Sequence, residues 1–194
     1  MRGVWVLVLV AGAAAAGAAY YIDERFNGGG FIPDFFMNIL RQKLVNLWKP
    51  RYGQDWRTPG TAFLGHMAMI SNGYAGSGGD ALPYYFQYYE LGEVIGTRTW
   101  GGLVGISGYP SLMDGGYVTA ASFGIMDLEG NWIVENKGVT PDNEVIEYPA
   151  DLIAGRDPQL ERRLRLPDPA HAMMDSSGSQ PLLGDDKAVA LCAQ

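Results

Sequence analysis

The sequence predicts an α/β fold, because stretches with the pattern of buried strands alternate with stretches that have the pattern of helices. The clearest case is an apolar run at residues 62–70, which leads through a glycine-rich turn into a helical segment at residues 81–91. A further strand is expected at residues 93–97, and an amphipathic helix is expected to begin near Pro33. A chain of 194 residues can form one domain with a buried core.

The composition indicates a globular protein and excludes several kinds of partner and site. A hydrophobic content of 47% with 18% charged residues is typical of a globular protein. The net charge of -7 argues against a nucleic-acid partner, since no basic stripe offsets it. Cys192 is the only cysteine, so a disulfide within the chain and a cysteine-rich metal site are excluded, and no metal or other cofactor is predicted.

The N-terminal segment has no charged side chain in residues 3–22, and three interpretations stay open. Residues 1–17 can form a secretory signal, because residues 4–10 have the character of its apolar region and small residues follow. Residues 4–22 can instead be an uncleaved membrane anchor. In the third interpretation, residues 18–23 end a buried strand and the preceding residues are foreign to the domain. A genuine signal places the protein outside the cytoplasm; otherwise a cytoplasmic location is expected.

Three consecutive glycines, Gly28 to Gly30, follow this predicted strand. Glycines let the backbone pass close to a ligand and present unobstructed amides, which suits an anion or a developing oxyanion. Pro33 and Asp34 then suit the first turn of a helix. Its apolar face is predicted from the helical spacing of Phe36, Ile39, Leu40, Leu44 and Leu47.

A loop long enough to help shape a cleft is predicted at residues 49–61, from its prolines, glycines and charges. Trp48 and Trp56 lie at or within this loop and are candidate substrate-binding residues. The alternative is that both indoles serve only for packing.

The glycine-rich turn at residues 72–80 joins the predicted strand to the predicted helix and contains Ser77. Strand, sharp turn and helix together present a serine hydroxyl beside a helix N-terminus, where free amides and the helix dipole favour negative charge. Ala75 replaces the first glycine of the G-x-S-x-G elbow, whereas Gly79 matches the last. Ser77 is therefore the candidate nucleophile, and an ordinary glycine turn is the alternative.

Glu135 follows a hairpin that is predicted from two apolar runs, at residues 117–126 and 132–134. A carboxylate at a strand end, before a tight turn, is placed to point at a neighbouring loop; a solvated surface glutamate is the alternative. A final amphipathic helix is predicted at residues 157–166. Residues 167–194 show no periodicity and are predicted to be a disordered tail.

Four motifs occur in order along the chain, namely DERFNGGG at residues 23–30, NGYAGS at 72–77, GTRTWGG at 96–102 and VENKGVTPD at 134–142. Together they resemble the catalytic core of the tricorn-type C-terminal processing serine proteases, a branch of the tail-specific protease family. The resemblance covers residues 18–166. It implies a crotonase/ClpP-like ββα spiral core, which we expect to be incomplete here.

The resemblance also implies roles for individual residues. Ser77 matches the nucleophile, and Gly30 and Gly78 match the positions whose backbone amides form the oxyanion hole. Glu135 matches the carboxylate of the catalytic tetrad, which orients the base histidine through a second serine. Gly78 departs from the acidic residue expected in the founding member of the family, although its backbone amide remains.

The general base of such a protease is not identified in this sequence. His66 lies in the strand that leads to Ser77, which is not the position of the base in the family, and His171 lies in the predicted tail. In the family, the base comes from a segment well upstream of the triple-glycine strand. We therefore expect the chain to be the C-terminal portion of a catalytic domain that lacks its base.

Two functions follow from these motifs. The first is a serine-type endopeptidase, a truncated core that hydrolyses peptide or unfolded protein through a Ser77 acyl-enzyme. The second is a non-catalytic remnant that binds peptide or assembles without turnover. Acyl-CoA enzymes of crotonase-like fold are a third class, but they do not need the serine elbow. The family implies a homo-oligomer, and a membrane partner only if residues 4–22 are an uncleaved anchor.

Overall fold

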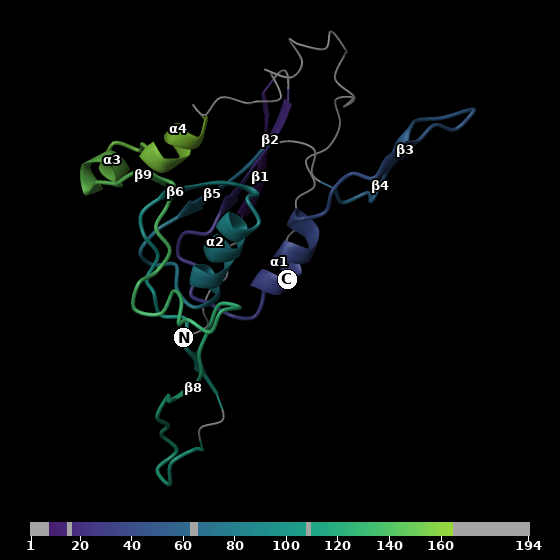
Figure 1. Cartoon of the computed structure of the whole chain (residues 1–194). Helices are drawn as coiled ribbons and strands as arrows, with labels where there is room; N and C mark the ends of the chain where they lie inside the picture. Colours follow the sequence, from purple (N-terminus) through teal and green to yellow (C-terminus); the bar gives the residue numbers. More distant parts are fainter. Residues whose placement is uncertain (1–7, 15–16, 63–65, 108–109, 165–194) are drawn as a thin grey trace.

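A five-stranded sheet forms the centre of the computed structural model, which describes residues 8–14, 17–62, 66–107 and 110–164 (Figure 1). The first two strands are antiparallel to each other, and all later neighbours are parallel. In spatial order the strands are β1 (Val8–Ala14), β2 (Gly17–Asp23), β5 (Met67–Ser71), β6 (Gly92–Gly96) and β9 (Asn143–Glu144). The mixed α/β architecture with a parallel sheet confirms the predicted fold class.

The edge strand β1 comes from the segment in which a signal or anchor was considered. It pairs with β2 along its whole length, from Val8 opposite Asp23 to Ala14 opposite Gly17. Among the described residues, no helix is long and apolar enough to cross a membrane. The division of the chain at residues 17 and 18, the signal segment and the boundary at residue 166 remain predictions.

Two helices, α1 (Pro33–Leu40) and α2 (Gly78–Tyr88), cover one face of the sheet (Figure 1). Side chains alternate between the two faces of a strand, so one residue in two points toward these helices. The main core fills this layer with Ile22, Phe36, Met37, Leu40, Met69, Leu82, Phe86 and Val94. Helix α2 thus sits over the central strands with its N-terminus at one edge of the sheet.

The other face of the sheet is covered from the C-terminal end of the described chain, where α3 (Pro149–Ile153) precedes α4 (Pro158–Leu164). Ile70 and Ile95 point to this face and are fully buried. Arg25 links the end of β2 to the start of α4, because its Nη2 lies 2.6 Å from Asp23 Oδ2 and its Nη1 lies 2.9 Å from Asp157 Oδ2. The predicted final helix is therefore present, from Pro158 to the end of the described residues at Leu164.

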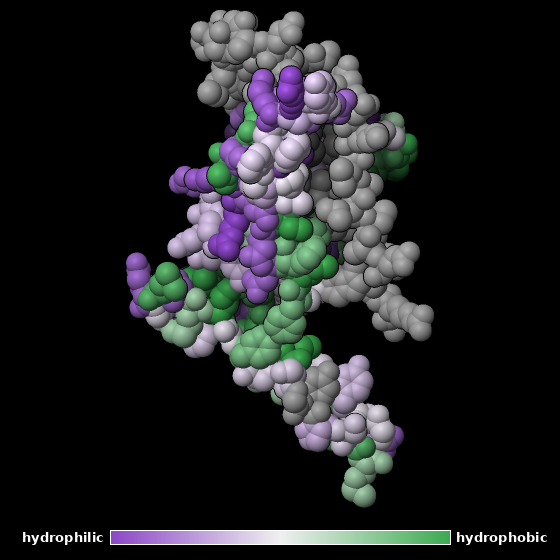
Figure 2. Space-filling view, turned by 90° about the vertical axis from the view of Figure 1, so that its right-hand side faces the viewer, coloured by the Kyte–Doolittle hydropathy of each residue, from purple (hydrophilic) through white to green (hydrophobic). Residues whose placement is uncertain are grey.

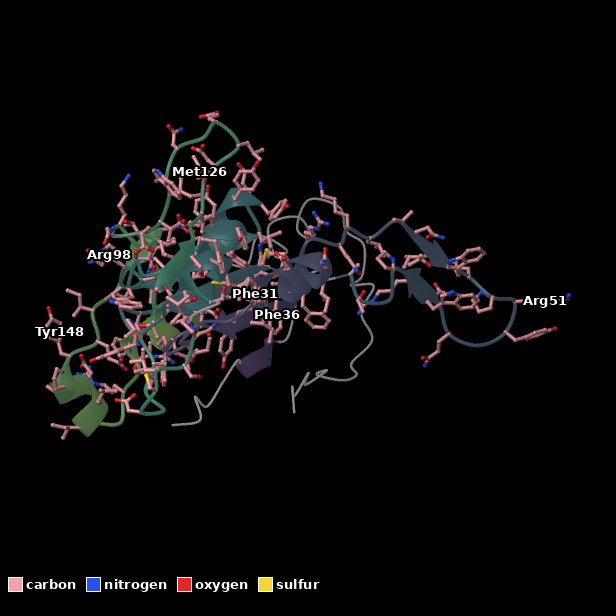
Figure 3. All side chains as sticks on the ribbon, turned by 90° about the horizontal axis from the view of Figure 1, so that it is seen from below. Phe31, Phe36, Arg51, Arg98, Met126 and Tyr148 are labelled. Atoms are coloured by element: carbon pink, nitrogen blue, oxygen red, sulfur yellow. The ribbon has the colours of Figure 1, made fainter. Side chains whose placement is uncertain are left out.

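The predicted helix from Pro33 is shorter than its predicted apolar face, because it ends at Leu40 and the chain then enters a hairpin. Strand β3 (Asn46–Trp48) pairs with β4 (Trp56–Thr58), so part of the stretch predicted as a loop is a strand. Trp48 lies opposite Trp56, and their rings stack with centroids 6.0 Å apart. Cross-strand aromatic pairing of this kind favours a strand at Leu47 over continued helix. The hairpin projects from the body, with Arg51 at its outer end (Figure 3).

A second projection, residues 105–107 and 110–133, contains the predicted hairpin in shorter form. Strand β7 (Gly105–Ile106) pairs with β8 (Ala121–Phe123), and the two expected partner runs pair beside their turn, at the bridge between Met126 and Trp132 and through Ile133 N, which donates to Ile125 O at 3.4 Å. Asp127 closes the turn between them by accepting hydrogen bonds from Glu129 and Asn131, which lower the pKa of its carboxyl. Figure 2 shows apolar surface, drawn green, where this segment leaves the body. None of its described residues is buried.

The remaining sequence predictions concern parts outside the described residues. They include the C-terminal tail at residues 167–194 together with His171 and Cys192. The structure neither supports nor contradicts them.

Phe86 tests the packing of α2 on the sheet. Its side chain is fully buried, so Phe86→Ala removes apolar contacts and leaves a cavity, and we expect a loss of about 3–5 kcal/mol in the free energy of unfolding. Tyr88 is 61% exposed on the same helix, so Tyr88→Ala should cost less than about 1 kcal/mol. Urea denaturation measures both. Equal losses for the two variants would contradict the described packing.

Candidate active site

The candidate site lies where three adjacent parallel strands end at the same edge of the sheet. The loop at residues 28–30 follows β2, Ser77 follows β5, and Gly101 and Gly102 follow β6. The carboxyl ends of parallel strands form the usual ligand-binding edge of an open α/β sheet. Motifs that are more than 70 residues apart in sequence therefore meet around Ser77, as the order of the motifs predicts.

Ser77 occupies a strained position at the N-terminus of α2. Its φ of 55° and ψ of -113° lie in a region that costs a non-glycine residue about 1–3 kcal/mol. The surrounding structure holds it there, because Ser77 N donates to Gly102 O at 2.9 Å and to Asp80 Oδ2 at 2.9 Å. This is the strand, tight turn and helix arrangement of a nucleophile elbow.

The carboxylate of Asp80 is the centre of a buried hydrogen-bond network around Ser77. Asp80 is fully buried, and its Oδ2 accepts from the backbone amides of Ser77 at 2.9 Å and Gly102 at 3.1 Å. Its Oδ1 accepts from Gly101 N at 2.8 Å and from the hydroxyl of Thr99. Thr99 Oγ1 in turn accepts from Val139 N at 2.8 Å. One side chain thus joins the serine turn to the loop after β6 and to the segment before β9.

Two glycines let the first loop approach the serine turn. A Cβ on Gly29 would lie 2.5 Å from Ser77 Cβ, and one on Gly78 would collide with the carbonyl oxygen of Gly30. Gly29 and Gly30 also have φ values of 119° and 117°, which side-chain-bearing residues rarely adopt. The amides of Gly30 and Gly78 donate to no acceptor among the described residues. Two unengaged N–H groups therefore lie close to the Ser77 hydroxyl.

Asn27 fixes the position of this loop. Its Oδ1 accepts from Gly29 N at 3.0 Å, and its backbone carbonyl accepts from Gly76 N at 2.9 Å. Its Nδ2 donates to Oε1 of the fully buried Glu24 at 2.6 Å. Burial raises the pKa of Glu24 to about 8, and the Asn27 hydrogen bond opposes that shift.

Glu135 faces the loop after β6, as its position before a tight turn predicts. Its Oε2 accepts from the backbone amides of Leu103 and Val104, each at 2.7 Å. Its other oxygen, Oε1, accepts no hydrogen bond from the described part of the chain. Glu135 therefore holds the loop that continues from Gly102, and Oε1 is left to receive a further donor.

A cavity of about 450 Å³ opens beside Ser77 and Gly78. Most of its wall is apolar, and it is made from α2, from the loop before α1 and from the projecting segment at 105–133. Burial and the nearby Asp34 carboxylate raise the pKa of Tyr85, which also lines the cavity. The apolar part consists of Phe31, Ala81, Leu103, Ile106, Phe123 and Ile125.

Trp48 and Trp56 do not line this cavity. Their rings stack on each other on the β3–β4 hairpin, and about half of each side chain is exposed. The structure therefore brings Ser77, Gly30, Gly78 and Glu135 into one region and leaves the two tryptophans outside it.

His66 lies at the wrong end of the strand to act on Ser77. It directly precedes β5 (Met67–Ser71), whereas Ser77 follows the other end, and five extended residues span roughly 16 Å. His66 is the only histidine in the described part of the chain. In that part no group of acidic, histidine or cysteine side chains could hold a metal ion.

Asp80, Asn27 and Glu24 have roles in this site that the sequence analysis did not assign. The spacing Ser77-x-x-Asp80 is that of a capping box, a local signal that identifies Asp80 as a partner of the Ser77 amide. Its bonds to Thr99, Gly101 and Gly102 depend on the fold and have no local signal.

Comparison with known proteins gives a consistent assignment. The chain matches peptidase family S41 over residues 13–145. It is 40% identical over 140 residues to the tricorn protease of Thermoplasma acidophilum, covering 72% of this chain and 13% of that protein. It is 39% identical over 145 residues to the "Putative Tricorn-like protease C-terminal subunit" of Sulfurisphaera tokodaii, covering 75% and 17%. The chain therefore spans less than a fifth of the length of these relatives.

A crystal structure of the tricorn protease matches the fold with a TM-score of 0.70 at 36% sequence identity. The match covers 80% of this chain and 15% of that one. Sequence and structure thus confirm the resemblance that the four motifs indicate.

Asp80→Asn tests the buried network. The less costly orientation of the new amide places its nitrogen at the position of Oδ1. There the nitrogen faces the N–H of Gly101, and the Thr99 hydroxyl must accept a hydrogen bond from it in place of donating one. We expect a loss of about 2–3 kcal/mol in the free energy of unfolding, because a buried donor is left unsatisfied. Amide exchange of Gly101 and Gly102 should accelerate, as NMR can measure.

The matched control is Asp127→Asn, which changes a partly exposed carboxylate that also accepts backbone hydrogen bonds. It should change the free energy of unfolding by less than about 1 kcal/mol. Unchanged exchange at Gly101 and Gly102 in Asp80→Asn would show that the carboxylate does not organise these loops.

Proposed function

The chain belongs to peptidase family S41, and from this premise we propose that it carries the nucleophile of a serine-type peptidase at Ser77. The observation that carries the proposal is the position of Ser77, strained at a helix N-terminus with two unengaged backbone amides beside it. A serine that serves only as a turn residue has no need of this conformation.

The reaction is acyl transfer to the serine hydroxyl. Ser77 Oγ attacks a peptide carbonyl, the leaving amine takes up a proton, and water then cleaves the acyl-enzyme. The amides of Gly30 and Gly78 hold the oxyanion that develops during attack. Loss of one such donor typically costs about 3–4 kcal/mol of transition-state stabilisation.

Glu135 is the carboxylate that orients the base in this proposal. Its Oε2 is occupied by two backbone amides, so the carboxylate is fixed in place while Oε1 remains available to a hydroxyl of the relay. Such a carboxylate acts through the groups it orients, as in other serine hydrolases.

The general base comes from residues outside the described part of the chain. A serine hydroxyl is a weak nucleophile at neutral pH without a base, and His66 lies at the far end of β5. The chain spans 13–17% of its tricorn relatives, and one of them is described as a C-terminal subunit. A segment or a second polypeptide that carries the histidine is the simplest source.

Peptide or unfolded protein is the proposed substrate. The apolar wall of the cavity beside Ser77 offers contacts to a side chain next to the cleaved bond. A homo-oligomer is proposed from the family alone.

A non-catalytic role is the second candidate, and the distance of His66 from Ser77 favours it for this chain in isolation. In that case the site binds peptide without turnover, and the serine turn remains as a structural element.

Labelling by a fluorophosphonate, with imidazole as an added base and Ser77→Ala as the negative control, distinguishes the two functions. We expect a fluorophosphonate to label Ser77 slowly in the isolated chain, and imidazole, added as a general base, to accelerate labelling roughly tenfold or more. Ser77→Ala should abolish labelling, whereas Ser122→Ala, an exposed serine on β8, should not change it. Mass spectrometry of the intact and digested protein measures both rate and site.

Labelling that persists in Ser77→Ala would overturn the assignment of the nucleophile. Absence of labelling even at high imidazole concentration would favour the non-catalytic role.

A further inference from the structure

Glu24 is a buried acid directly behind the candidate site that the proposed chemistry does not use. It follows β2, is fully buried, and its backbone amide donates to Ile70 O at 2.8 Å. Its Oε1 accepts the 2.6 Å hydrogen bond from Asn27, while its Oε2 has no hydrogen-bond partner among the described residues. A buried carboxyl group with so few partners is far less costly as a neutral acid than as a carboxylate.

Asn27 connects Glu24 to both turns that flank Ser77. Its side-chain oxygen receives the amide of Gly29, and its backbone carbonyl receives the amide of Gly76. The same carbonyl lies where a Cβ on Gly79 would be, so the first turn of α2 also packs against it. A movement of Asn27 therefore displaces the loop at residues 28–30 and the serine turn together.

We propose that Glu24 is a positioning residue that, as an uncharged acid, holds Asn27 and through it the loop at residues 28–30 beside Ser77. The role of that loop as an oxyanion hole rests on the proposed function; the placement of the loop by Glu24 does not. When the carboxyl ionises, the buried charge needs more donors than Asn27 alone supplies, so water must enter beside Oε2 and the packing that holds Asn27 and its loop is loosened.

The surroundings of Glu24 favour the neutral form. Burial, with a smaller contribution from the neighbouring Asp23, raises its pKa to about 8 against the opposing effect of the Asn27 hydrogen bond. The nearest cation in sequence, Arg25, is engaged elsewhere, with Asp23, Asp157 and Glu147 at 2.6, 2.9 and 4.0 Å. From β5 the packed group is the carbonyl of Ile70, which is uncharged.

The sign of the pH dependence follows from this raised pKa. The folded chain keeps the proton of Glu24 above pH 4.5, where the unfolded chain has released it, so the contribution to stability is complete below about pH 4.5. That contribution is lost as the pH rises toward about 8, and it changes no further above that value.

Three variants of the full chain test the proposal by thermal unfolding between pH 5 and 9 and by amide exchange. Glu24→Gln keeps an acceptor for Asn27 and cannot ionise, so its melting temperature should exceed that of the original chain by several degrees at pH 8 and converge with it at pH 5. Glu24→Leu removes the acceptor, and exchange at Gly29 and Gly76 should accelerate at every pH. Glu93→Gln changes an exposed glutamate, so its pH dependence should match that of the original chain.

A functional profile adds a readout that a purely structural role would not move. The rate of imidazole-assisted Ser77 labelling is measured in the original chain and in Glu24→Gln. The ratio of the first rate to the second should fall roughly tenfold by pH 9, because Glu24 ionises only in the original chain. Glu24→Gln is thus the conservative variant that keeps the site competent at high pH.

The proposal is overturned if Glu24→Gln and the original chain show the same pH dependence of melting. It is also overturned if Glu24→Leu leaves exchange at Gly29 and Gly76 unchanged. If Glu24→Leu does not fold, Glu24→Gln still decides the question. Melting and exchange need no turnover, so a failure of Ser77 labelling would count against the proposed function alone.

Discussion

The hydrogen bonds to the buried carboxylate of Asp80 are the constraint on which the site depends. They bring together the serine turn, the loop after β6 and, through Thr99, the segment before β9. A buried negative charge is stable only when several donors surround it, so the chain is required to place four of them around this side chain. The same requirement holds Ser77 in a backbone conformation that it would otherwise leave.

Two buried acidic residues flank Ser77, and they differ in the number of hydrogen-bond donors that surround them. On the side of β6, Asp80 gathers backbone donors, whereas on the side of β2 the buried Glu24 has a single donor from Asn27. Glycines allow both arrangements to close, since Gly29 and Gly78 have no room for a side chain where the two loops meet. Ser77 therefore sits between one polar network that is fully satisfied and one that is only sparsely satisfied.

Much of this site could be predicted from the sequence, because local patterns place strands and turns and parallel strands end at one edge. Ser77, Gly30 and Gly78 follow from such patterns and from the family resemblance, and the structure brings them together with Glu135. The parts that could not be predicted depend on partners distant in sequence. Leu44 and Leu47 have helical spacing, yet Leu47 pairs with Arg57 in a hairpin. Trp48 and Trp56 stack on each other across this hairpin, a pairing that depends on the strand register and has no local signal.

The segment at residues 105–133 supplies Ile106, Phe123 and Ile125 to the cavity wall, yet none of its described residues is buried. Its internal links are short strands and an aspartate turn, and Phe123 stacks on Phe31 in the loop before α1. Segments with so little burial open with a free energy well below that of the core. The edge of the sheet that carries Ser77 and the part of the cavity wall formed by this segment thus belong to different cooperative units. A ligand that binds only when this segment lies against the cavity stabilises that arrangement. Part of its binding free energy is then used to order the segment.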